Sequence, residues 1–274
     1  MKHITDAKIL NNGINMPWFG LGTFRAAGTE VANAVSTALE IGYRSIDTAA
    51  VYGNEEEVGQ SIAASGVARD SLFVTTKVWN EDQGFDTTLR AFETSSKKLG
   101  LDFIDLYLIH WPGKDKYKDT WRALERLYTE GRVRAIGVSN FQIHHLEELM
   151  KDSSTVPAVN QVELHPRFIQ KELHDYCTLH NIQIEAWAPL MKGRLQENEL
   201  LIDIAQKYGK TVAQVILRWG LQNEIVIIPK SVTASRIKEN SEIFDFELTQ
   251  DEVNAVSGLD AGERIGTDPD KLIF

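Results

Sequence analysis

Short apolar runs alternate along the chain with longer stretches in which apolar residues recur at helical spacing. Eight of the runs have the length and β-branched content of strands, and several, such as LFVTTKV and IVIIPK, are apolar or β-branched at nearly every position. A continuous apolar run is typical of a parallel strand buried on both faces. We therefore predict strands at residues 17–22, 43–48, 72–78, 103–110, 133–139, 158–164, 183–189 and 225–230.

Helical patterns lie between these strands, and several end at a glycine, a common C-terminal cap because glycine readily adopts a left-handed backbone. Gly42, Gly100, Gly131 and Gly209 stand at such ends. Thr249 has the capping-box spacing to Glu252 and begins a last helix. The predicted helices cover 31–41, 87–99, 120–130, 144–150, 172–180 and 199–208, with two extra helices at 211–221 and 249–259.

The alternation of strands and helices predicts a parallel sheet, and eight strand–helix units favour a closed (β/α)8 TIM barrel. The alternative is a doubly wound open sheet, which normally binds a dinucleotide through G-x-G-x-x-G after its first strand. Gly20 and Gly22 lack the third glycine of that motif. Asn12 and Gly13 predict a β-hairpin with a type I′ turn, which we place across the bottom of the barrel. No linker interrupts the pattern, so residues 1–274 are predicted to form a single domain.

Composition and charge narrow the class of protein. With 43% hydrophobic and 25% charged residues in 274, the chain resembles an ordinary globular protein. Its net charge of −10 argues against partners such as nucleic acid or an anionic membrane. The single cysteine, Cys177, excludes an intrachain disulfide framework and a cysteine-rich zinc site, and we predict no metal. The start lacks a secretory signal and no apolar run could span a bilayer, so a cytoplasmic location is expected. The sequence has no long exposed apolar stripe, so a monomer is expected.

Polar residues stand where the predicted strands end, and in a barrel these ends meet at one rim. Asp47 ends the second strand and Tyr52 lies in the loop after it, while Lys77 and His110 end the next two strands. A buried Asp and a buried Lys are costly unless they pair with each other. Further candidates at the same rim are Trp79, Trp111, Ser139, Asn140, Gln161, Glu163, Glu185, Trp187, Lys230 and Ser231.

These residue types suit the acid half of carbonyl reduction. A tyrosine hydroxyl has a pKa of about 10 in water. A nearby ammonium lowers that pKa, a carboxylate keeps the ammonium charged, and a neutral histidine orients the substrate oxygen. Proton transfer of this kind is worth about 10²–10⁴ in rate. Each residue alone has an ordinary structural explanation, and only the four together, Asp47, Tyr52, Lys77 and His110, favour function.

The other half of the reaction is a hydride, which side chains cannot supply, so a cofactor is required. The stretch IIPKSVTASRIKEN follows the last strand with Lys230, then Thr233 as a helix N-cap, then Arg236. Free N–H groups at a helix start with two cations form a phosphate site. The cations, with the hydroxyls of Ser231 and Thr233, favour a 2′-phosphate and therefore NADPH. Ser139, Asn140 and Gln161 could hold its carboxamide, and Trp187 could stack on its nicotinamide ring.

These motifs carry a resemblance to the aldo-keto reductase superfamily over essentially the whole chain. GYRSIDTA at 42–49, with Tyr52 and residues 55–59, is similar to the first signature of the family, and 227–240 is similar to its cofactor signature. The resemblance implies catalytic roles for Asp47, Tyr52, Lys77 and His110, with Tyr52 as the proton donor. It implies cofactor contacts at Gly22, Ser139, Asn140, Gln161, Trp187, Leu190, Lys192, Lys230, Ser231, Thr233, Arg236, Glu239 and Asn240.

Within the superfamily, segments such as MPWFGLGTF and GVSNFQIHHLEEL are most similar to bacterial glyoxal and methylglyoxal reductases. The implied function is NADPH-dependent reduction of small aldehydes and α-dicarbonyls to alcohols. A 2,5-diketogluconate-type ketone reductase is the alternative within the family. The short stretch after the last helix predicts an open pocket, with walls expected at Phe24, Val51, Trp79, His110 and Trp111.

Three functions other than carbonyl reduction are alternative hypotheses for this sequence. A barrel glycosidase would use two carboxylates, for which Glu163 and Glu185 are the candidates. A metal-dependent hydrolase needs clustered ligands, and only the neighbours His144 and His145 come near that pattern. A cofactor-sensing regulatory barrel would bind the nucleotide without rapid turnover.

Overall fold

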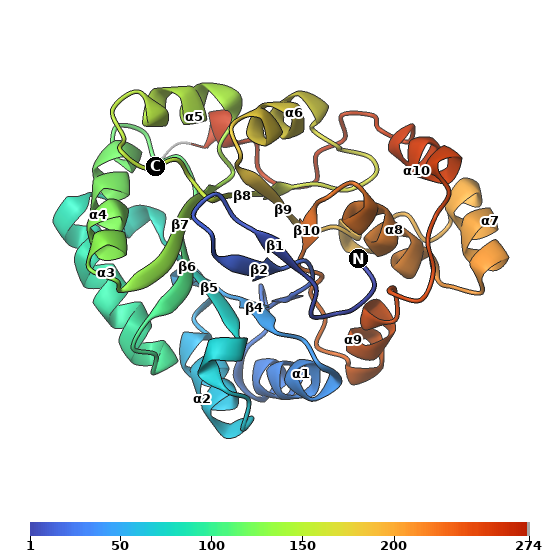
Figure 1. Cartoon of the computed structure of the whole chain (residues 1–274), viewed down its shortest axis with the longest axis horizontal. Helices are drawn as coiled ribbons and strands as arrows, with labels where there is room; N and C mark the ends of the chain where they lie inside the picture. Colours follow the sequence, from blue (N-terminus) through green and yellow to red (C-terminus); the bar gives the residue numbers. More distant parts are fainter. Residues whose placement is uncertain (273–274) are drawn as a thin grey trace.

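A parallel sheet of eight strands curls until its last strand meets its first (Figure 1). The computed structural model describes residues 1–272, so Ile273 and Phe274 of the predicted domain lie outside the described part. Residues 19–22 and 227–230 close the barrel through the bridges Phe19–Ile227 and Gly22–Lys230. The strands are β3 (Leu21–Gly22), β4 (Ser45–Asp47), β5 (Phe73–Val78), β6 (Ile104–Ile109), β7 (Val133–Ser139), β8 (Val159–Glu163), β9 (Gln183–Trp187) and β10 (Val226–Ile227). The predicted (β/α)8 barrel is confirmed.

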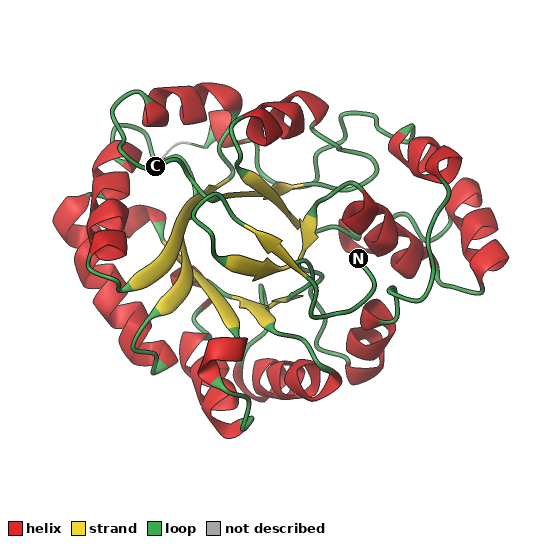
Figure 2. Cartoon of the chain, in the orientation of Figure 1, coloured by secondary structure: helices red, strands yellow, loops and turns green. Residues whose placement is uncertain are grey.

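Helices surround the barrel (Figure 2). They are α1 (Gly28–Ile41), α2 (Glu55–Ala64), α3 (Phe85–Leu99), α4 (Tyr117–Thr129), α5 (Ile143–Met150), α6 (Lys171–Leu179), α7 (Glu199–Tyr208), α8 (Val212–Gln222), α9 (Ala234–Ser241) and α10 (Gln250–Ser257). Gly42 and Gly209 end α1 and α7 with left-handed φ values of 117° and 61°. The predicted capping box starts α10, where Glu252 N donates to Thr249 Oγ1 at 3.2 Å.

Two helix assignments from the sequence need correction. Helix α2 was not among the predicted helices, because it is short and opens with three glutamates rather than with an apolar face. The segment near 211–221 was expected to be an extra helix, but α8 packs directly against β10 and is buried from Val212 to Leu221. It is α7 that lies outside, against α8 and α10. An all-round apolar helix needs cover on every side, which explains this order.

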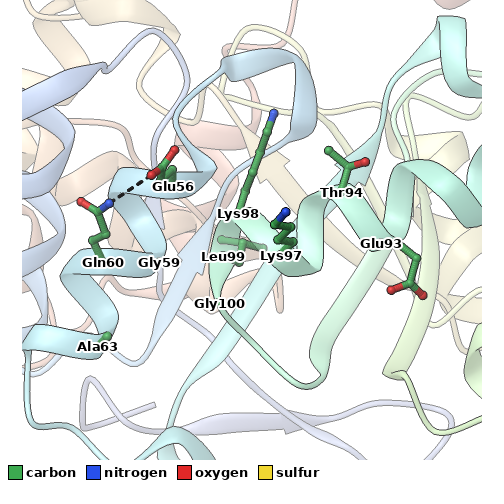
Figure 3. Close-up of a pocket in the computed structure, with 10 residues that line it drawn as sticks. All are labelled: Glu56, Gly59, Gln60, Ala63, Glu93, Thr94, Lys97, Lys98, Leu99 and Gly100. Carbon is green, nitrogen blue, oxygen red and sulfur yellow. Dashed lines mark hydrogen bonds between the residues drawn. The ribbon is translucent and has the colours of Figure 1, made fainter.

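A groove opens between α2 and α3 on the outer wall of the barrel (Figure 3). The two helices approach closely, since a Cβ on Gly59 would lie 2.2 Å from the carbonyl oxygen of Leu99. The groove has a volume of about 760 Å³ and a charged rim that includes Glu56, Lys97 and Lys98. None of the predicted site residues lines it, so this groove is separate from the candidate active site.

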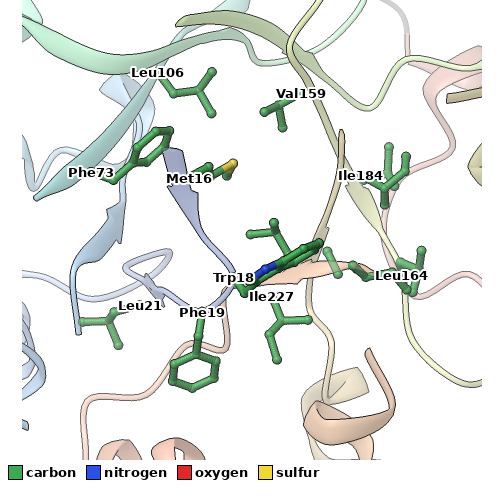
Figure 4. Packing of buried hydrophobic residues seen from close by; sticks show 14 of the residues in the cluster. Met16, Trp18, Phe19, Leu21, Phe73, Leu106, Val159, Leu164, Ile184 and Ile227 are labelled. Atoms are coloured by element: carbon green, nitrogen blue, oxygen red, sulfur yellow. The ribbon is translucent and has the colours of Figure 1, made fainter. Parts of the chain in front are cut away.

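An N-terminal hairpin covers the end of the barrel where the strands begin. Strand β1 (Ala7–Ile9) pairs antiparallel with β2 (Asn15–Pro17), and Asn12 Nδ2 donates to Arg134 O near the start of β7 at 2.9 Å. The fully buried Met16 lies with Trp18 among the core side chains Leu106, Val159 and Ile184 (Figure 4). Burying a side chain of this size contributes about 1.5–3 kcal/mol. The predicted closure of the bottom is therefore confirmed.

The predicted type I′ turn of this hairpin is wrong. That turn needs positive φ at two central residues, and in this loop only Gly13 has it, at 85°. Gly13 N donates to Leu10 O at 2.9 Å, and Leu10 N donates to Ile14 O at 2.9 Å. The connection is thus a three-residue loop in which a left-handed glycine follows a tight turn.

Across residues 1–272, every helix is too short or too polar to cross a membrane.

Candidate active site

A buried ion pair lies at the carboxyl end of the barrel. Lys77 Nζ donates to both carboxylate oxygens of Asp47, at 2.7 and 2.8 Å, and to the carbonyl oxygen of Thr48 at 2.9 Å. Burial opposes the charge on Lys77, but the combined effect of Asp47, Tyr52 and Glu185, with Asp47 the largest of the three, raises the pKa of Lys77. The ammonium therefore stays charged at neutral pH in a site that water does not reach.

Tyr52 stands beside this ion pair at the end of the single turn η1 (Ala50–Tyr52). The Nζ of Lys77 lies 5.1 Å from the centre of the Tyr52 ring. We predicted that the ammonium lowers the pKa of Tyr52, but its pKa is raised, because burial outweighs the effect of Lys77. The phenol consequently keeps its proton across the neutral range and can act as an acid, while Lys77 stabilises the phenolate once the proton has left.

Four rings line the space above the ion pair. The ring centroids are 5.7 Å apart for Tyr52 and His110, 5.2 Å for Trp79 and His110, and 5.1 Å for Phe24 and Tyr52. Burial, with a smaller contribution from Lys77, holds the pKa of His110 well below its ordinary value. The imidazole is therefore neutral at pH 7 and can donate one hydrogen bond to a substrate oxygen. Two further wall residues were expected. Val51 is 44% exposed, and Trp111 is partly exposed.

Gln161 and Glu185 extend the polar cluster into the barrel. The Nε2 of Gln161 donates to Asp47 Oδ2 at 2.8 Å and to Glu185 Oε2 at 2.7 Å. Both amide hydrogens are thus used, which leaves Gln161 Oε1 as the atom able to accept from a ligand. Burial, and secondly the charge of Asp47, raise the pKa of Glu185 to about 8, so its carboxyl is mostly protonated at neutral pH.

The raised pKa of Glu185 makes the free energy of unfolding depend on pH. An unfolded glutamate ionises near pH 4.3, whereas the pKa of Glu185 in the folded protein is about 8. Between these values the folded state holds a proton that the unfolded state has lost. Glu185 therefore lowers the free energy of unfolding as pH rises, by roughly 1.4 kcal/mol per unit. Glu185→Gln removes that loss, so we expect the variant to gain stability relative to wild type between about pH 5 and pH 8.

Urea unfolding at about pH 5 and about pH 8 measures the difference in the free energy of unfolding between Glu185→Gln and wild type. Glu172→Gln, on the exposed face of α6, is the matched control and should follow wild type at both. If the difference in the free energy of unfolding between Glu185→Gln and wild type is the same at both pH values, the raised pKa of Glu185 is contradicted.

Asn140 and Trp187 hold each other in place. Trp187 Nε1 donates to Asn140 Oδ1 at 2.8 Å, and Asn140 Nδ2 donates to His110 O at 3.0 Å and Ser139 Oγ at 3.1 Å. Asn140 adopts a left-handed φ of 64°, a conformation that asparagine tolerates better than most residues. The structure thus brings together Ser139, Asn140, Gln161 and Trp187, but Asn140 Nδ2 is already engaged and would reach a carboxamide only by exchanging partners.

One residue of this region was missed by the sequence analysis. Asn54 is fully buried and accepts from Thr48 Oγ1 at 2.6 Å. Its Nδ2 donates to the carbonyl oxygens of Thr23 and Ala26, at 3.0 and 2.8 Å. These bonds join the loop that carries Phe24 to the loop that carries Tyr52. A lone loop asparagine carries no recognisable signal, because its partners come from other loops.

The predicted phosphate site lies beside the barrel seam. Lys230 pairs with Gly22, which in turn is opposite Asp47, so the cations and the ion pair share one end of the barrel. Lys230 and Arg236 are exposed, and Thr233 is the N-cap of α9 without a side-chain capping bond. Ser231 Oγ instead accepts from the backbone N–H of Thr233 at 3.1 Å.

The five remaining predicted cofactor contacts are Gly22, Leu190, Lys192, Glu239 and Asn240. A Cβ on Gly22 would lie 2.8 Å from the carbonyl oxygen of Ile228, so this glycine is needed for the seam itself. Glu239 accepts from Thr211 Oγ1 at 2.9 Å, and Asn240 is buried. Leu190 and Lys192 lie in the loop after β9, where Lys192 has a left-handed φ of 55°.

The structure also bears on the glycosidase and the metal-dependent hydrolase hypotheses. Glu163 and Glu185 are both fully buried and hydrogen-bonded inside the protein, so neither faces a glycoside, and the glycosidase reading is wrong. His144 and His145 do meet a carboxylate, with Nε2 atoms 3.1 and 3.7 Å from Asp270 Oδ1. However, His145 Nδ1 accepts from Gln142 N at 3.1 Å, so its Nε2 carries the proton in the neutral ring. That nitrogen can donate to Asp270 but has no lone pair for a metal.

Comparison with known proteins decides the family. The sequence profile of the Aldo/keto reductase family matches residues 19–261. The chain belongs to the aldo/keto reductase family. This aldo-keto reductase is 61% identical to the glyoxal reductase of Bacillus subtilis (strain 168) over 272 residues, which cover 99% of both chains. It is 47% identical to the methylglyoxal reductase DkgA of Escherichia coli (strain K12), with 96% of each chain covered.

Solved structures agree with this assignment. The aldo-keto reductase superposes with a TM-score of 0.94 on a mutant of Gox0644 in complex with NADPH, at 44% identity and with 98% of each chain covered. The resemblance inferred from the two sequence signatures is therefore confirmed, and with it the expectation of a carbonyl-reducing oxidoreductase.

Proposed function

We propose that this aldo-keto reductase uses NADPH to reduce small aldehydes and α-dicarbonyls, such as methylglyoxal and glyoxal, to alcohols. The observation that carries the proposal is the placement of a protonated Tyr52 between the buried Asp47–Lys77 pair and a neutral His110. The names of the two relatives above support the choice of substrate class. The rings of Phe24 and Trp79 give the site an apolar wall suited to a small carbonyl compound.

The side chains supply the proton and the orientation. We assign His110 to donate a hydrogen bond to the carbonyl oxygen and Tyr52 to transfer its phenolic proton to that oxygen as negative charge develops there. The resulting phenolate is stabilised by the Lys77 ammonium, which Asp47 keeps charged and aimed. Proton uptake from solvent then restores the phenol after the alcohol leaves.

The residues at the rim fit NADPH. Two exposed cations, Lys230 and Arg236, flank the start of α9, and the hydroxyl of Thr233 makes no capping bond, so these donors are available to a 2′-phosphate. Gln161 Oε1 is free to accept from a carboxamide, and the partly exposed indole of Trp187 can stack on a nicotinamide ring. When bound, the cofactor supplies the hydride that adds to the carbonyl carbon.

An absorbance assay at the reduced-nicotinamide band tests the function. We expect multiple turnovers of NADPH with methylglyoxal, glyoxal and simple aldehydes, and slower oxidation of NADH. A 2,5-diketogluconate substrate in the same assay tests the ketone-reductase alternative. Stoichiometric binding of NADPH without turnover of any carbonyl would contradict the proposal and favour a cofactor-sensing role.

Arg236 is expected to set the preference for the phosphorylated cofactor. Arg236→Ala removes a charge-assisted contact to the 2′-phosphate, so we expect the KM for NADPH to rise roughly 10- to 100-fold while the KM for NADH changes little. Steady-state kinetics with both cofactors measure this difference. Lys238→Ala, an exposed cation on the same helix, is the control and should leave both values unchanged. Equal losses for both cofactors in Arg236→Ala would place the 2′-phosphate elsewhere.

We also propose that residues 1–274 act as one domain, as a monomer and in the cytoplasm. One continuous hydrophobic core joins the hairpin, the barrel and the outer helices, which supports the single domain. The monomer and the compartment rest on the sequence alone.

A further inference from the structure

Glu163 ends β8 as a buried carboxylate held by three donors, none of them in the cluster around Tyr52. Its Oε1 accepts from the backbone N–H of Ile265 at 2.6 Å and lies 3.0 Å from His165 Nε2. Its Oε2 accepts from the backbone N–H of Gly266 at 2.8 Å. Burial alone would favour the neutral acid, but these donors outweigh it and lower the pKa of Glu163. The carboxylate is therefore charged at neutral pH.

The segment that Glu163 holds, residues 260–272, is called the C-terminal tail below. It follows α10 and passes the carboxyl ends of β8 and β9, where it contacts Glu163 and Trp187. Its Gly266 lies directly against Trp187, because a Cβ added there would be 2.3 Å from Cη2 of the indole and 2.7 Å from Glu163 Oε2. Glycine is the only residue that fits between the carboxylate and the ring.

The indole of Trp187 is thus fixed from two directions. Asn140 Oδ1 accepts its Nε1–H at 2.8 Å on one side, and the backbone of Gly266 meets the opposite edge of the ring. Among residues 1–272, the tail has other attachments. The backbone N–H groups of Ala261 and Glu263 donate to Arg167 O at 3.1 and 3.0 Å, while Ile265 packs against the core and Pro269 is buried. The charged pairs of the tail lie at the surface. Arg167 pairs with Glu263 at 3.1 Å, and His144 pairs with Asp270 at 3.1 Å, with side chains 35–60% exposed. Exposed pairs of this kind contribute little, so Glu163 is the one buried charged side chain that binds the tail within the described residues.

We propose that Glu163 is a positioning residue for cofactor binding: it seats the C-terminal tail against Trp187 and so fixes the indole on which the nicotinamide ring stacks. The inference rests on the proposed function, because it takes the stacking role of Trp187 from it. Glu163 touches neither cofactor nor substrate and acts through Gly266 and Trp187. The nicotinamide end of the site is therefore coupled to a tail distant in sequence, whereas the 2′-phosphate end at Lys230 and Arg236 is independent of it.

Two variants test this coupling from opposite sides. Glu163→Gln turns an NH₂ group toward a backbone or imidazole donor and so releases one attachment of the tail. Gly266→Ala keeps Glu163 but inserts a methyl group between the carboxylate and the indole. Glu263→Gln changes an exposed residue of the same tail and is the matched control. Far-UV circular dichroism and urea unfolding report whether each variant is folded.

Two ligands separate the ends of the site. We expect Glu163→Gln and Gly266→Ala to weaken NADPH about tenfold, as measured by energy transfer from tryptophan to the nicotinamide, with reduced transfer at saturation. The dissociation constant of adenosine 2′,5′-bisphosphate, which lacks the nicotinamide, should stay within about twofold of wild type. Glu263→Gln should match wild type for both ligands.

The outcomes are distinct. Unchanged NADPH affinity in the folded Gly266→Ala variant would overturn the inference, as would equal losses for NADPH and the bisphosphate. A wild-type protein that binds neither ligand would overturn the proposed function and the inference with it. If wild type oxidises NADPH with a carbonyl substrate but the two variants bind NADPH as tightly as wild type, the inference is overturned and the proposed function stands.

Discussion

Tyr52→Phe should reduce the rate of carbonyl reduction by about 10²–10⁴ while NADPH still binds. The substitution removes only the hydroxyl and leaves the ring between Phe24 and His110, so the wall of the site is kept. Without that hydroxyl no group of suitable acidity lies beside the developing alkoxide, because His110 is neutral and Lys77 is held by Asp47. Single-turnover kinetics at saturating NADPH measure the loss, and fluorescence titration measures binding.

The control for this experiment is Tyr128→Phe, which removes a hydroxyl from α4 far from the site. It should retain full activity. Turnover by Tyr52→Phe at the wild-type rate would contradict the donor assignment. In wild type the pKa of Tyr52 is raised, so reduction should persist through neutral pH and decline only at alkaline pH, where the phenol ionises.

The sequence predicted which polar side chains converge at the carboxyl end of the barrel, and the reason is geometric. Parallel strands place their carboxyl ends on one rim, so Asp47, Lys77 and His110 had to converge once the strands were assigned. What the sequence could not supply was the balance of forces within that cluster. The ammonium of Lys77 was expected to dominate the pKa of Tyr52, but burial dominates, and burial depends on packing from elements that lie far away in sequence.

Other features escaped prediction because their partners are distant or their local signals are ambiguous. Glu163 was considered only as a possible catalytic carboxylate, since nothing near it in sequence reveals that Ile265 and Gly266 are its donors. The Asn12–Gly13 pair fits two hairpin geometries, and the register of the flanking strands selects between them. The role of Asn54 depends on two loops that meet only in the folded protein.

Lys77→Met should cost about 3–5 kcal/mol of stability as well as most of the activity. Removal of the ammonium leaves the Asp47 carboxylate buried at 2% exposure, with Gln161 Nε2 as the remaining side-chain donor. A buried charge without its partner is far more costly than the intact pair. Urea unfolding measures the loss, and an assay with methylglyoxal measures the activity.

The double variant Asp47→Asn with Lys77→Met separates stability from catalysis. Once both charges are gone, most of the lost stability should return, because a neutral pair has little desolvation cost. Activity should stay low, since nothing then stabilises the phenolate of Tyr52. Stability of Lys77→Met equal to wild type, or recovery of activity in the double variant, would contradict the role assigned to the ion pair.

The seam of the barrel has a consequence for biosynthesis. Strands β3 and β10 contain two residues each, and the barrel closes only when residues 19–22 meet residues 227–230. A nascent chain therefore carries two open sheet edges until residues 227–230 have left the ribosome, and open edges are sites of aggregation. The same event brings Lys230 beside Gly22, so the proposed nucleotide-binding end of the barrel cannot assemble before synthesis has passed residue 230.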